Sequence, residues 1–123
     1  MKKLLVVDDS VAIRDMVKKS FRDQGFEVLA AASVREGLET LRQHAHVDLI
    51  LSDLIMPEQD GFDFLGELRA MPSFAATPFL FLTTVDCVVE KQRARHMNAH
   101  GWIQKPFNPD ELVSLAKRMT DAA

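Results

Sequence analysis

Apolar residues gather along the chain in five short runs, separated by longer stretches of mixed polarity. Two of the runs, "VDLILS" and "FLFL", are almost continuously apolar, which is typical of strands covered by helices on both faces. The runs predict five strands, at Lys3–Val7, Glu27–Ala31, Val47–Ser52, Phe79–Leu82 and Trp102–Gln104.

The stretches between these runs carry apolar residues at helical spacing, so each predicts an amphipathic helix. Gly25 stands where the first helix is expected to end. The fourth helix, 88–98, has the least regular pattern, because "EKQRAR" interrupts a thin apolar face. The faces expected to be buried are Ile13, Met16, Val17 and Phe21 in the first helix, Val34, Leu38 and Leu41 in the second, Phe64, Leu65 and Leu68 in the third, and Leu112, Leu115, Ala116 and Met119 in the last.

Strands and helices alternate in the order βα, repeated five times. This alternation predicts a parallel sheet with helices on both faces, and right-handed crossovers limit the topologies. We expect one α/β domain over residues 1–123, a doubly wound (βα)5 flavodoxin-like sandwich with five parallel strands in the order 2-1-3-4-5. A ligand site is then expected beyond the carboxyl ends of the strands, where strands 1 and 3 diverge.

Polar side chains follow four of the five predicted strands. They are Asp8 and Asp9 after the first strand, Asp53 after the third, Thr83 after the fourth and Lys105 after the fifth. Because these strand ends meet at one edge of the sheet, the side chains are expected to converge in one crevice. Each one alone is explained more simply, for example as a helix cap. Five such residues at four strand ends are hard to explain as coincidence.

Three carboxylates in one crevice repel each other unless a cation neutralises them. All-oxygen ligands favour a hard ion such as Mg²⁺ (or Mn²⁺). Lys105 suits a phosphoryl oxygen as a point charge, and Thr83 can donate a hydrogen bond to another such oxygen. Asp53 stands alone on its strand and is the candidate nucleophile, because carboxylates attack phosphorus to form aspartyl-phosphates.

Composition and charge limit the remaining function classes. The chain has 15 basic and 18 acidic residues and a net charge of -3, which gives no basic surface for nucleic acid or for an anionic membrane. Cys87 is the only cysteine, so an intrachain disulfide is excluded and a cytoplasmic location is expected. The first apolar run is too short for a signal peptide or a membrane span.

Four segments of the chain resemble the response-regulator receiver domains of two-component signalling: "VVDDS", "ILSDLIMPEQDGFDFL", "FLFLTT" and "GWIQKPF". They cover the chain almost end to end, in the order and spacing of the family. The resemblance implies that Asp53 is the phosphoacceptor. It also implies an Mg²⁺ site formed by Asp8, Asp9, Asp53 and the backbone carbonyl of Ile55.

The same resemblance implies a switch at Thr83 and Trp102, contacts from Thr83 and Lys105 to the phosphoryl group, and a cis peptide bond between Lys105 and Pro106. The implied phosphoryl donor is a histidine kinase or a phosphotransfer protein. An output partner is expected on the face formed by the fourth helix, fifth strand and fifth helix, with a phosphatase as a further partner. Direct nucleic-acid contact, membrane insertion and conventional enzymatic turnover are not expected.

Within the family, "PFLFLTT" and "GWIQKPFNPDEL" are most similar to chemotaxis-type single-domain regulators. The sequence departs from the family pattern at four positions. Thr84 replaces a small Ala or Gly and narrows the expected access to the phosphoryl group, and Trp102 replaces Tyr or Phe. Ile55 and Val85 are apolar where many members are polar, which predicts slow loss of the phosphoryl group because neither side chain can orient water.

Alternative functions stay open at the level of sequence. The chain can be the receiver part of a longer regulator that carries an output domain. An aspartate-nucleophile phosphatase acting on small substrates shares the chemistry, although such enzymes carry a D-x-D motif after their first strand. A flavodoxin-like cofactor role is less consistent with the sequence, because no Ser/Thr/Gly phosphate loop follows the first strand.

Overall fold

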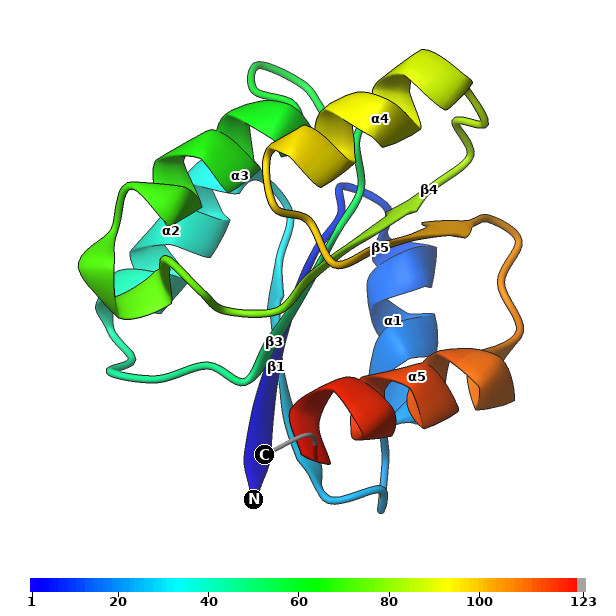
Figure 1. Cartoon of the computed structure of the whole chain (residues 1–123). Coiled ribbons are helices and arrows are strands. Elements are labelled where there is room, and N and C mark those ends of the chain that lie inside the picture. Colours follow the sequence, from blue (N-terminus) through cyan, green and yellow to red (C-terminus); the bar gives the residue numbers. More distant parts are fainter. Residues whose placement is uncertain (122–123) are drawn as a thin grey trace.

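A central parallel sheet with helices packed on both faces makes up residues 1–121, the part of the chain that the computed structural model describes (Figure 1). In chain order its elements are β1 Lys2–Val7, α1 Val11–Ser20, β2 Phe26–Ala31, α2 Val34–Arg42, β3 Leu49–Ser52, α3 Gly61–Arg69, a 3₁₀ turn Pro72–Phe74, β4 Phe79–Thr83, α4 Val88–His96, β5 Gly101–Gln104 and α5 Pro109–Asp121.

The strand order is β2-β1-β3-β4-β5, and every pairing in the sheet is parallel, as predicted. Leu4 on β1 pairs with Val28 on one side and with Leu49 on the other. The chain therefore reverses its winding direction beside β1. The reversal separates the loops that follow β1 and β3 and opens a crevice at the carboxyl edge of the sheet.

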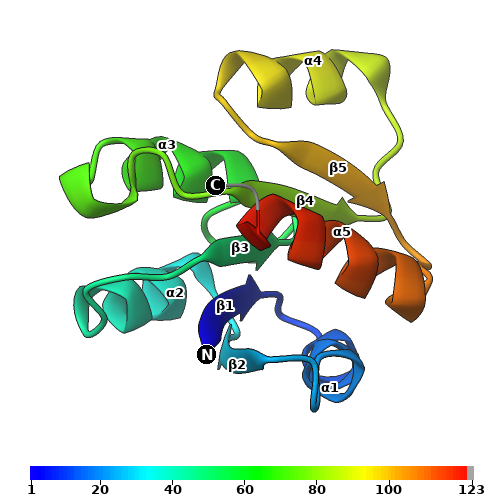
Figure 2. The same cartoon turned by 60° about the horizontal axis from the view of Figure 1, so that its bottom comes forward.

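The helices form two layers, with α2, α3 and α4 on one face of the sheet and α1 and α5 on the other (Figure 2). Successive residues of a strand point to opposite faces. Leu5 and Val7 therefore pack under α2 and α3, while Leu4 and Val6 pack against α1 and α5. All four side chains are buried. This two-sided burial is the reason that the strands are continuously apolar in sequence.

The predicted buried faces of α2 and α3 are confirmed, because all six of their named residues are buried. Two expectations about α1 are wrong. The helix ends at Ser20, and Gly25 lies in the turn before β2 with a φ of 84°. Met16 is 41% exposed, because Val17 and Phe21 already fill the core side of this helix. In α5, Val113 is buried beside Leu112 and Ala116, a contribution that the spacing did not indicate.

Helix α4 buries few of its side chains. It ends at His96, two residues earlier than predicted, and Ala94 is its one buried residue. The chain leaves the helix through Asn98, whose φ of 66° lies in the left-handed region. None of the helices within residues 1–121 is both long and apolar enough to cross a membrane.

Candidate functional site

Asp53 lies directly after β3, and backbone contacts fix its position. Its N–H donates to the carbonyl of Val7 (2.9 Å), and its Oδ1 accepts a hydrogen bond from the Leu54 N–H (2.7 Å). Helix α3 approaches this loop so closely that a Cβ atom at Gly61 would lie 2.5 Å from the carbonyl oxygen of Asp53. The side chain of Asp53 is 12% exposed. It is therefore held firmly yet can be reached from outside.

Two more carboxylates stand opposite Asp53 in the loop after β1. Carboxylate oxygens of Asp8, Asp9 and Asp53 lie within 4.8 Å of one another. Asp8 is buried, whereas Asp9 is exposed. Several carboxylate oxygens close together are the ligands that hard divalent cations prefer. The three residues therefore fit an Mg²⁺ or Mn²⁺ site.

The start of α1 decides against the simpler explanation that these aspartates are helix caps. Ser10 is the N-cap, and its Oγ accepts a hydrogen bond from the Ile13 N–H (3.3 Å). Asp8 Oδ1 accepts from the Ser10 N–H (2.9 Å), one residue before the helix. The second oxygen of Asp8 and the carboxylate of Asp9 are therefore not used to cap α1.

Lys105 brings a positive charge to the same crevice from the loop after β5. Its Nζ lies 2.7 Å from Asp8 Oδ2 and 3.2 Å from Asp53 Oδ2. The Lys105–Pro106 peptide bond is cis, as the resemblance implied. The Lys105 N–H also donates to the carbonyl of Thr83 (2.8 Å), which ties this loop to the end of β4.

Burial and pairing act in opposite directions on the charges of this site. Burial raises the pKa of Asp8 above its ordinary value, and it outweighs the hydrogen bonds from Lys105 and Ser10. Burial also works against the charged form of Lys105, but the hydrogen bond and charge of Asp8, with the charge of Asp53, raise the pKa of Lys105. Lys105 is thus a fixed ammonium beside Asp53 at neutral pH.

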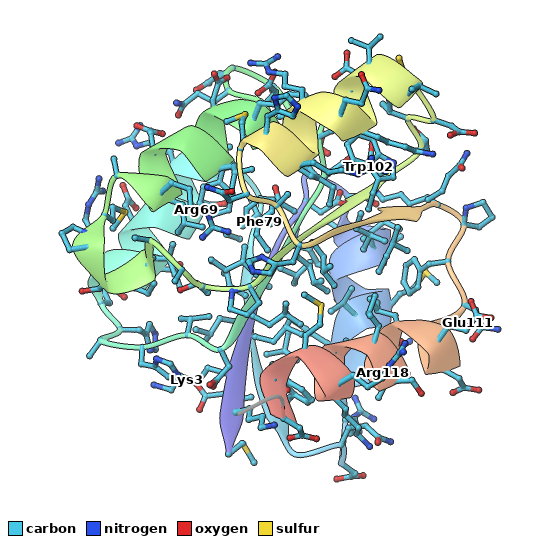
Figure 3. All side chains as sticks on the ribbon, viewed as in Figure 1. Lys3, Arg69, Phe79, Trp102, Glu111 and Arg118 are labelled. Carbon is cyan, nitrogen blue, oxygen red and sulfur yellow. The ribbon has the colours of Figure 1, made fainter. Side chains whose placement is uncertain are left out.

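A chain of hydrogen bonds leads from the crevice to Trp102. Thr83 is buried at the end of β4, and its Oγ1 accepts from the Val85 N–H (3.3 Å). The Val85 carbonyl in turn accepts from the indole Nε1–H of Trp102 (3.0 Å). Trp102 is half-buried under α4 (Figure 3). Its ring packs against that of Phe81, with 5.3 Å between the ring centroids. Thr83 and Trp102, which the resemblance implies form a switch, are therefore linked through the backbone N–H and carbonyl of one residue, Val85.

The apolar positions near the site differ in their surroundings. Ile55, in the loop after Asp53, is 62% exposed. Thr84 is also exposed, whereas Val85 is half-buried and packs against the core on the α3 and α4 side. Of the two apolar residues, Ile55 and Val85, only Ile55 is therefore largely open to solvent. Val85 contributes its backbone to the link between Thr83 and Trp102.

Some supporting residues were not found from the sequence. Arg14 Nη1 donates to the carbonyl of Asp8 (2.7 Å), and Ser52 Oγ donates to the carbonyl of Asp53 (2.9 Å). Neither residue has a signal in the hydrophobic pattern. Gly61 could have been found from the sequence, because a glycine at the start of a helix, directly after the acceptor loop, suggests that two backbones approach closely.

Comparisons with known proteins agree with this geometry. Residues 4–117 match the family model described as the response regulator receiver domain. The chain is 34% identical over 116 residues to the probable transcriptional regulator ycf29 of Porphyra purpurea, covering 94% of this chain and 55% of that protein. It is 33% identical over 117 residues to the response regulator Rre1 of Synechocystis, covering 94% of this chain and 50% of that protein. It thus spans about half the length of these relatives.

Among solved structures, the chemotaxis protein CheY4 of Vibrio cholerae superimposes with a TM-score of 0.91. The two chains are 40% identical, and the match covers 97% of this chain and 98% of that one. The family match over most of the chain, the fold and the order of the strand-end residues all agree. This chain belongs to the response regulator receiver domain family.

Proposed function

We propose that this chain is a phosphorylation-activated signalling switch that accepts a phosphoryl group on Asp53. Receiver domains are signalling domains, and their relatives here include regulators of transcription and chemotaxis. The observation that carries the proposal is the position of Asp53, whose Oδ2 lies 3.2 Å from the ammonium of Lys105 and whose carboxylate lies beside those of Asp8 and Asp9.

The proposed reaction is transfer from a phosphohistidine of a histidine kinase or phosphotransfer protein. A carboxylate oxygen of Asp53 forms a bond to phosphorus, the phosphorus–nitrogen bond of the donor breaks, and its electron pair stays on the imidazole. When bound by Asp8, Asp9, Asp53 and the Ile55 carbonyl, Mg²⁺ (or Mn²⁺) would supply positive charge to the transferring group. Lys105 contributes its ammonium to the same charge, already held against Asp53.

In this proposal Thr83 and Trp102 convert the new charge into a change of shape. The hydroxyl of Thr83 can donate to a phosphoryl oxygen, and a side-chain movement that brings it towards that oxygen takes Oγ1 away from the Val85 N–H. Release of the Val85 N–H frees the loop between β4 and α4, and this loop holds the indole of Trp102. A local charge change thereby biases a two-state element on the output side of the domain.

The proposed output is partner binding at the face of α4, β5 and α5, with a phosphatase as a second partner that ends the signal. The domain catalyses only its own phosphorylation and dephosphorylation, works in the cytoplasm and occupies residues 1–123 as one receiver unit. Since the relatives are about twice as long, a longer regulator with an output domain is compatible with every contact described above.

The decisive experiment is the intact mass of the protein after incubation with acetyl phosphate and Mg²⁺. One phosphoryl group is expected on the parent chain and none on Asp53→Asn. Asp15→Asn, an exposed aspartate on α1, is the matched control and should behave as the parent does. Equal phosphorylation of Asp53→Asn and the parent would refute the assignment of Asp53.

A further inference from the structure

Arg14, near the start of α1, contacts the main chain of the loop that carries Asp8 and Asp9. Its Nη1 donates to the carbonyl of Asp8 (2.7 Å). The ion pairs found within residues 1–121 do not include Arg14, whereas Lys105 pairs with Asp8 and with Asp53. The two cations are therefore used differently. Lys105 neutralises carboxylates, and Arg14 holds the backbone between them.

A positive charge at this place works against a cation site. Arginine carries its charge at neutral pH, and like charges repel each other more strongly where water is partly excluded. Arg14 is half-buried, and its Nη1 bonds to Asp8, which belongs to the cluster of three carboxylates. Its charge alone therefore weakens the binding of a cation there. A compensating contribution has to come from the geometry that its hydrogen bond fixes.

Asp9 is the member of the cluster whose side chain needs such help. Asp8 is held at both of its carboxylate oxygens, since Oδ1 accepts from the Ser10 N–H (2.9 Å) and Oδ2 accepts from Lys105 Nζ (2.7 Å). The hydrogen bonds found within residues 1–121 include none to the carboxylate of Asp9, which is exposed. The direction of the Asp9 side chain is therefore set by its backbone.

Arg14 fixes this backbone on both sides of Asp9. The peptide group between Asp8 and Asp9 is planar, so the Asp8 carbonyl and the Asp9 N–H turn as one unit. The guanidinium of Arg14 holds that unit through the carbonyl. The backbone N–H of Arg14 donates to the carbonyl of Ser10 (3.1 Å), the residue that follows Asp9. The path of the chain through Asp9 is thus tied to the first turn of α1.

We propose that Arg14 is a positioning residue of the cation site, which keeps the Asp9 carboxylate directed towards those of Asp8 and Asp53. Groups that orient metal ligands without binding the metal commonly change metal affinity by about 10- to 100-fold. Because Arg14 bonds to a carbonyl, it does so without occupying a carboxylate oxygen that the cation would use. This inference rests on the proposed function and names a residue that supports the Mg²⁺ site of that function.

The sign of the effect separates positioning from charge. Removal of the positive charge in Arg14→Met would by itself tighten the binding of a divalent cation, whereas loss of positioning weakens it. We expect Arg14→Met to bind the cation about tenfold more weakly than the parent chain, the lower end of the range for such orienting groups. Arg14→Lys should recover part of this loss, because an ammonium can still donate to the Asp8 carbonyl.

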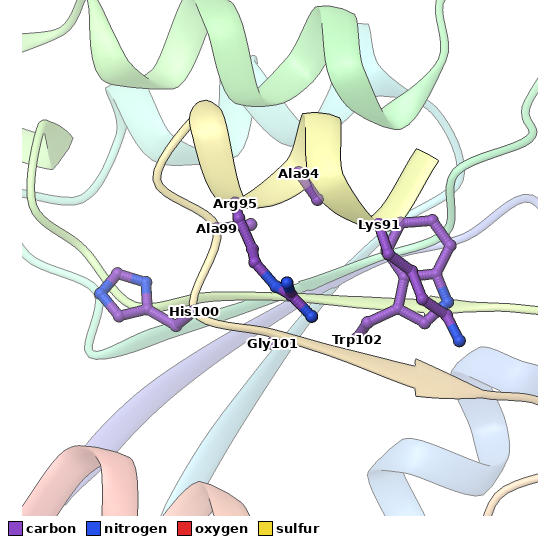
Figure 4. A pocket seen from close by; sticks show the side chains of 7 residues that line it. All are labelled: Lys91, Ala94, Arg95, Ala99, His100, Gly101 and Trp102. Carbon is purple, nitrogen blue, oxygen red and sulfur yellow. The ribbon is translucent and has the colours of Figure 1, made fainter. Parts of the chain in front are cut away.

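The test titrates the whole chain with Mn²⁺ at neutral pH and follows the free ion by electron paramagnetic resonance. The control is Arg95→Met, which removes the same charge from an exposed residue of α4, beside β5 (Figure 4). Helix α4 lies on the other face of the sheet from α1, so this variant should bind Mn²⁺ at least as tightly as the parent. Urea unfolding in EDTA reports on the fold of each variant without a metal.

Four outcomes would overturn the role of Arg14. They are a parent chain that binds no Mn²⁺, an Arg14→Met variant that binds it as tightly as the parent or more tightly, equal losses in Arg14→Met and Arg95→Met, and a lower urea midpoint in Arg14→Met with unchanged Mn²⁺ affinity. The last of these outcomes is the one that a purely structural role predicts.

Phosphoryl uptake from acetyl phosphate, followed by intact mass against Mg²⁺ concentration, tests the proposed function separately. Arg14→Met should need about tenfold more Mg²⁺ for half-maximal uptake and should reach the parental extent at saturation, because only the affinity for the cation has changed. A parent chain that binds Mn²⁺ more tightly than Arg14→Met but takes up no phosphoryl group would refute the proposed function and leave the positioning role supported.

Discussion

At the scale of single residues, the hydroxyl of Thr83 joins the chemistry of the site to the shape of the domain. It is buried at the carboxyl end of β4 and accepts a hydrogen bond from the Val85 N–H. No other side chain bonds to that N–H in the described structure. The state of one hydroxyl therefore decides whether the loop that holds Trp102 is tethered.

Removal of this hydroxyl should separate phosphorylation from its readout. In Thr83→Ala we expect phosphoryl uptake to slow by about tenfold, equivalent to one hydrogen bond of about 1.4 kcal/mol. The change in Trp102 emission caused by beryllofluoride should be largely lost, because no hydroxyl remains to exchange partners. Thr83→Ser keeps the hydroxyl and should preserve both signals. Emission changes of equal size in Thr83→Ala and the parent would contradict this route.

The grouping of polar side chains at the strand ends could be predicted from the sequence, because it depends only on the order of the strands in the sheet. Once five apolar runs are assigned to a parallel sheet, Asp8, Asp53 and Lys105 must meet at one edge. Arg14 could not be predicted in the same way. Its bond to the Asp8 carbonyl depends on the direction of one long side chain on α1, and no periodic pattern records that direction.

At the scale of elements, α4 is held by polar contacts more than by an apolar face. Ala94 is its one buried residue, and Arg69 on α3 anchors the chain just beyond its end. Arg69 Nη2 donates to the Asn98 carbonyl (2.7 Å), while Nη1 donates to the carbonyls of Phe74 (3.1 Å) and Thr77 (2.9 Å). One side chain thus connects α3, the segment before β4 and the end of α4.

Arg69 should therefore control the stability of the α4 region. Arg69→Met removes three hydrogen bonds from a charged donor, and we expect the free energy of unfolding in urea to fall by about 2–3 kcal/mol. Amide hydrogen exchange should become faster at Met97, Asn98 and Ala99. Arg42→Met, at an exposed position of α2, should change stability by less than about 0.5 kcal/mol. Unchanged exchange beyond α4 in Arg69→Met would show that Arg69 does not anchor this segment.

The segment between α4 and β5 should also respond to pH through His100. Its Nδ1 accepts from the Phe79 N–H (3.2 Å), and burial together with the nearby charge of Arg69 lowers the pKa of His100. The unfolded chain then binds a proton before the folded chain does, so stability is fully present above the ordinary pKa of about 6.5 and falls as the pH drops below it. His100→Asn keeps a hydrogen-bond acceptor that does not titrate. The fall in the free energy of unfolding between pH 7 and pH 5, measured with urea, should therefore be smaller in this variant. An equally steep loss in His100→Asn would assign it to other groups.

The end of α4 shows why the boundaries of helices are predicted less well than the order of the strands. Its sequence has almost no apolar face, so periodicity could not fix its end, and the contacts of Arg69 and Asn98 come from distant parts of the chain. Helix α3 is similar at its start, where Asp60 and Asp63 form a capping box that only the folded loop reveals. Long-range polar contacts and local caps therefore set the boundaries that hydrophobic spacing leaves open.

At the scale of the whole molecule, negative charge is concentrated at the carboxyl edge of the sheet and positive charge on α4. Asp8, Asp9 and Asp53 converge at that edge, and within residues 1–121 only Lys105 pairs with two of them. Mutual repulsion of the carboxylates costs stability in the folded state. The same crowding of carboxylates creates affinity for a divalent cation and reactivity towards a phosphoryl group.

Mg²⁺ should therefore stabilise the folded chain as a whole. A cation that binds only the folded state raises the free energy of unfolding by roughly 2.7 kcal/mol at a concentration of 100 times its Kd. We expect a higher Tm with MgCl₂ than with NaCl at equal ionic strength, followed by circular dichroism at neutral pH. The increase should be smaller in Asp9→Asn, which removes an exposed carboxylate of the cluster, and unchanged in the surface control Asp15→Asn. A parent chain whose Tm is the same in both salts, or an Asp9→Asn variant that responds as fully as the parent, would rule out a cation site formed by this cluster.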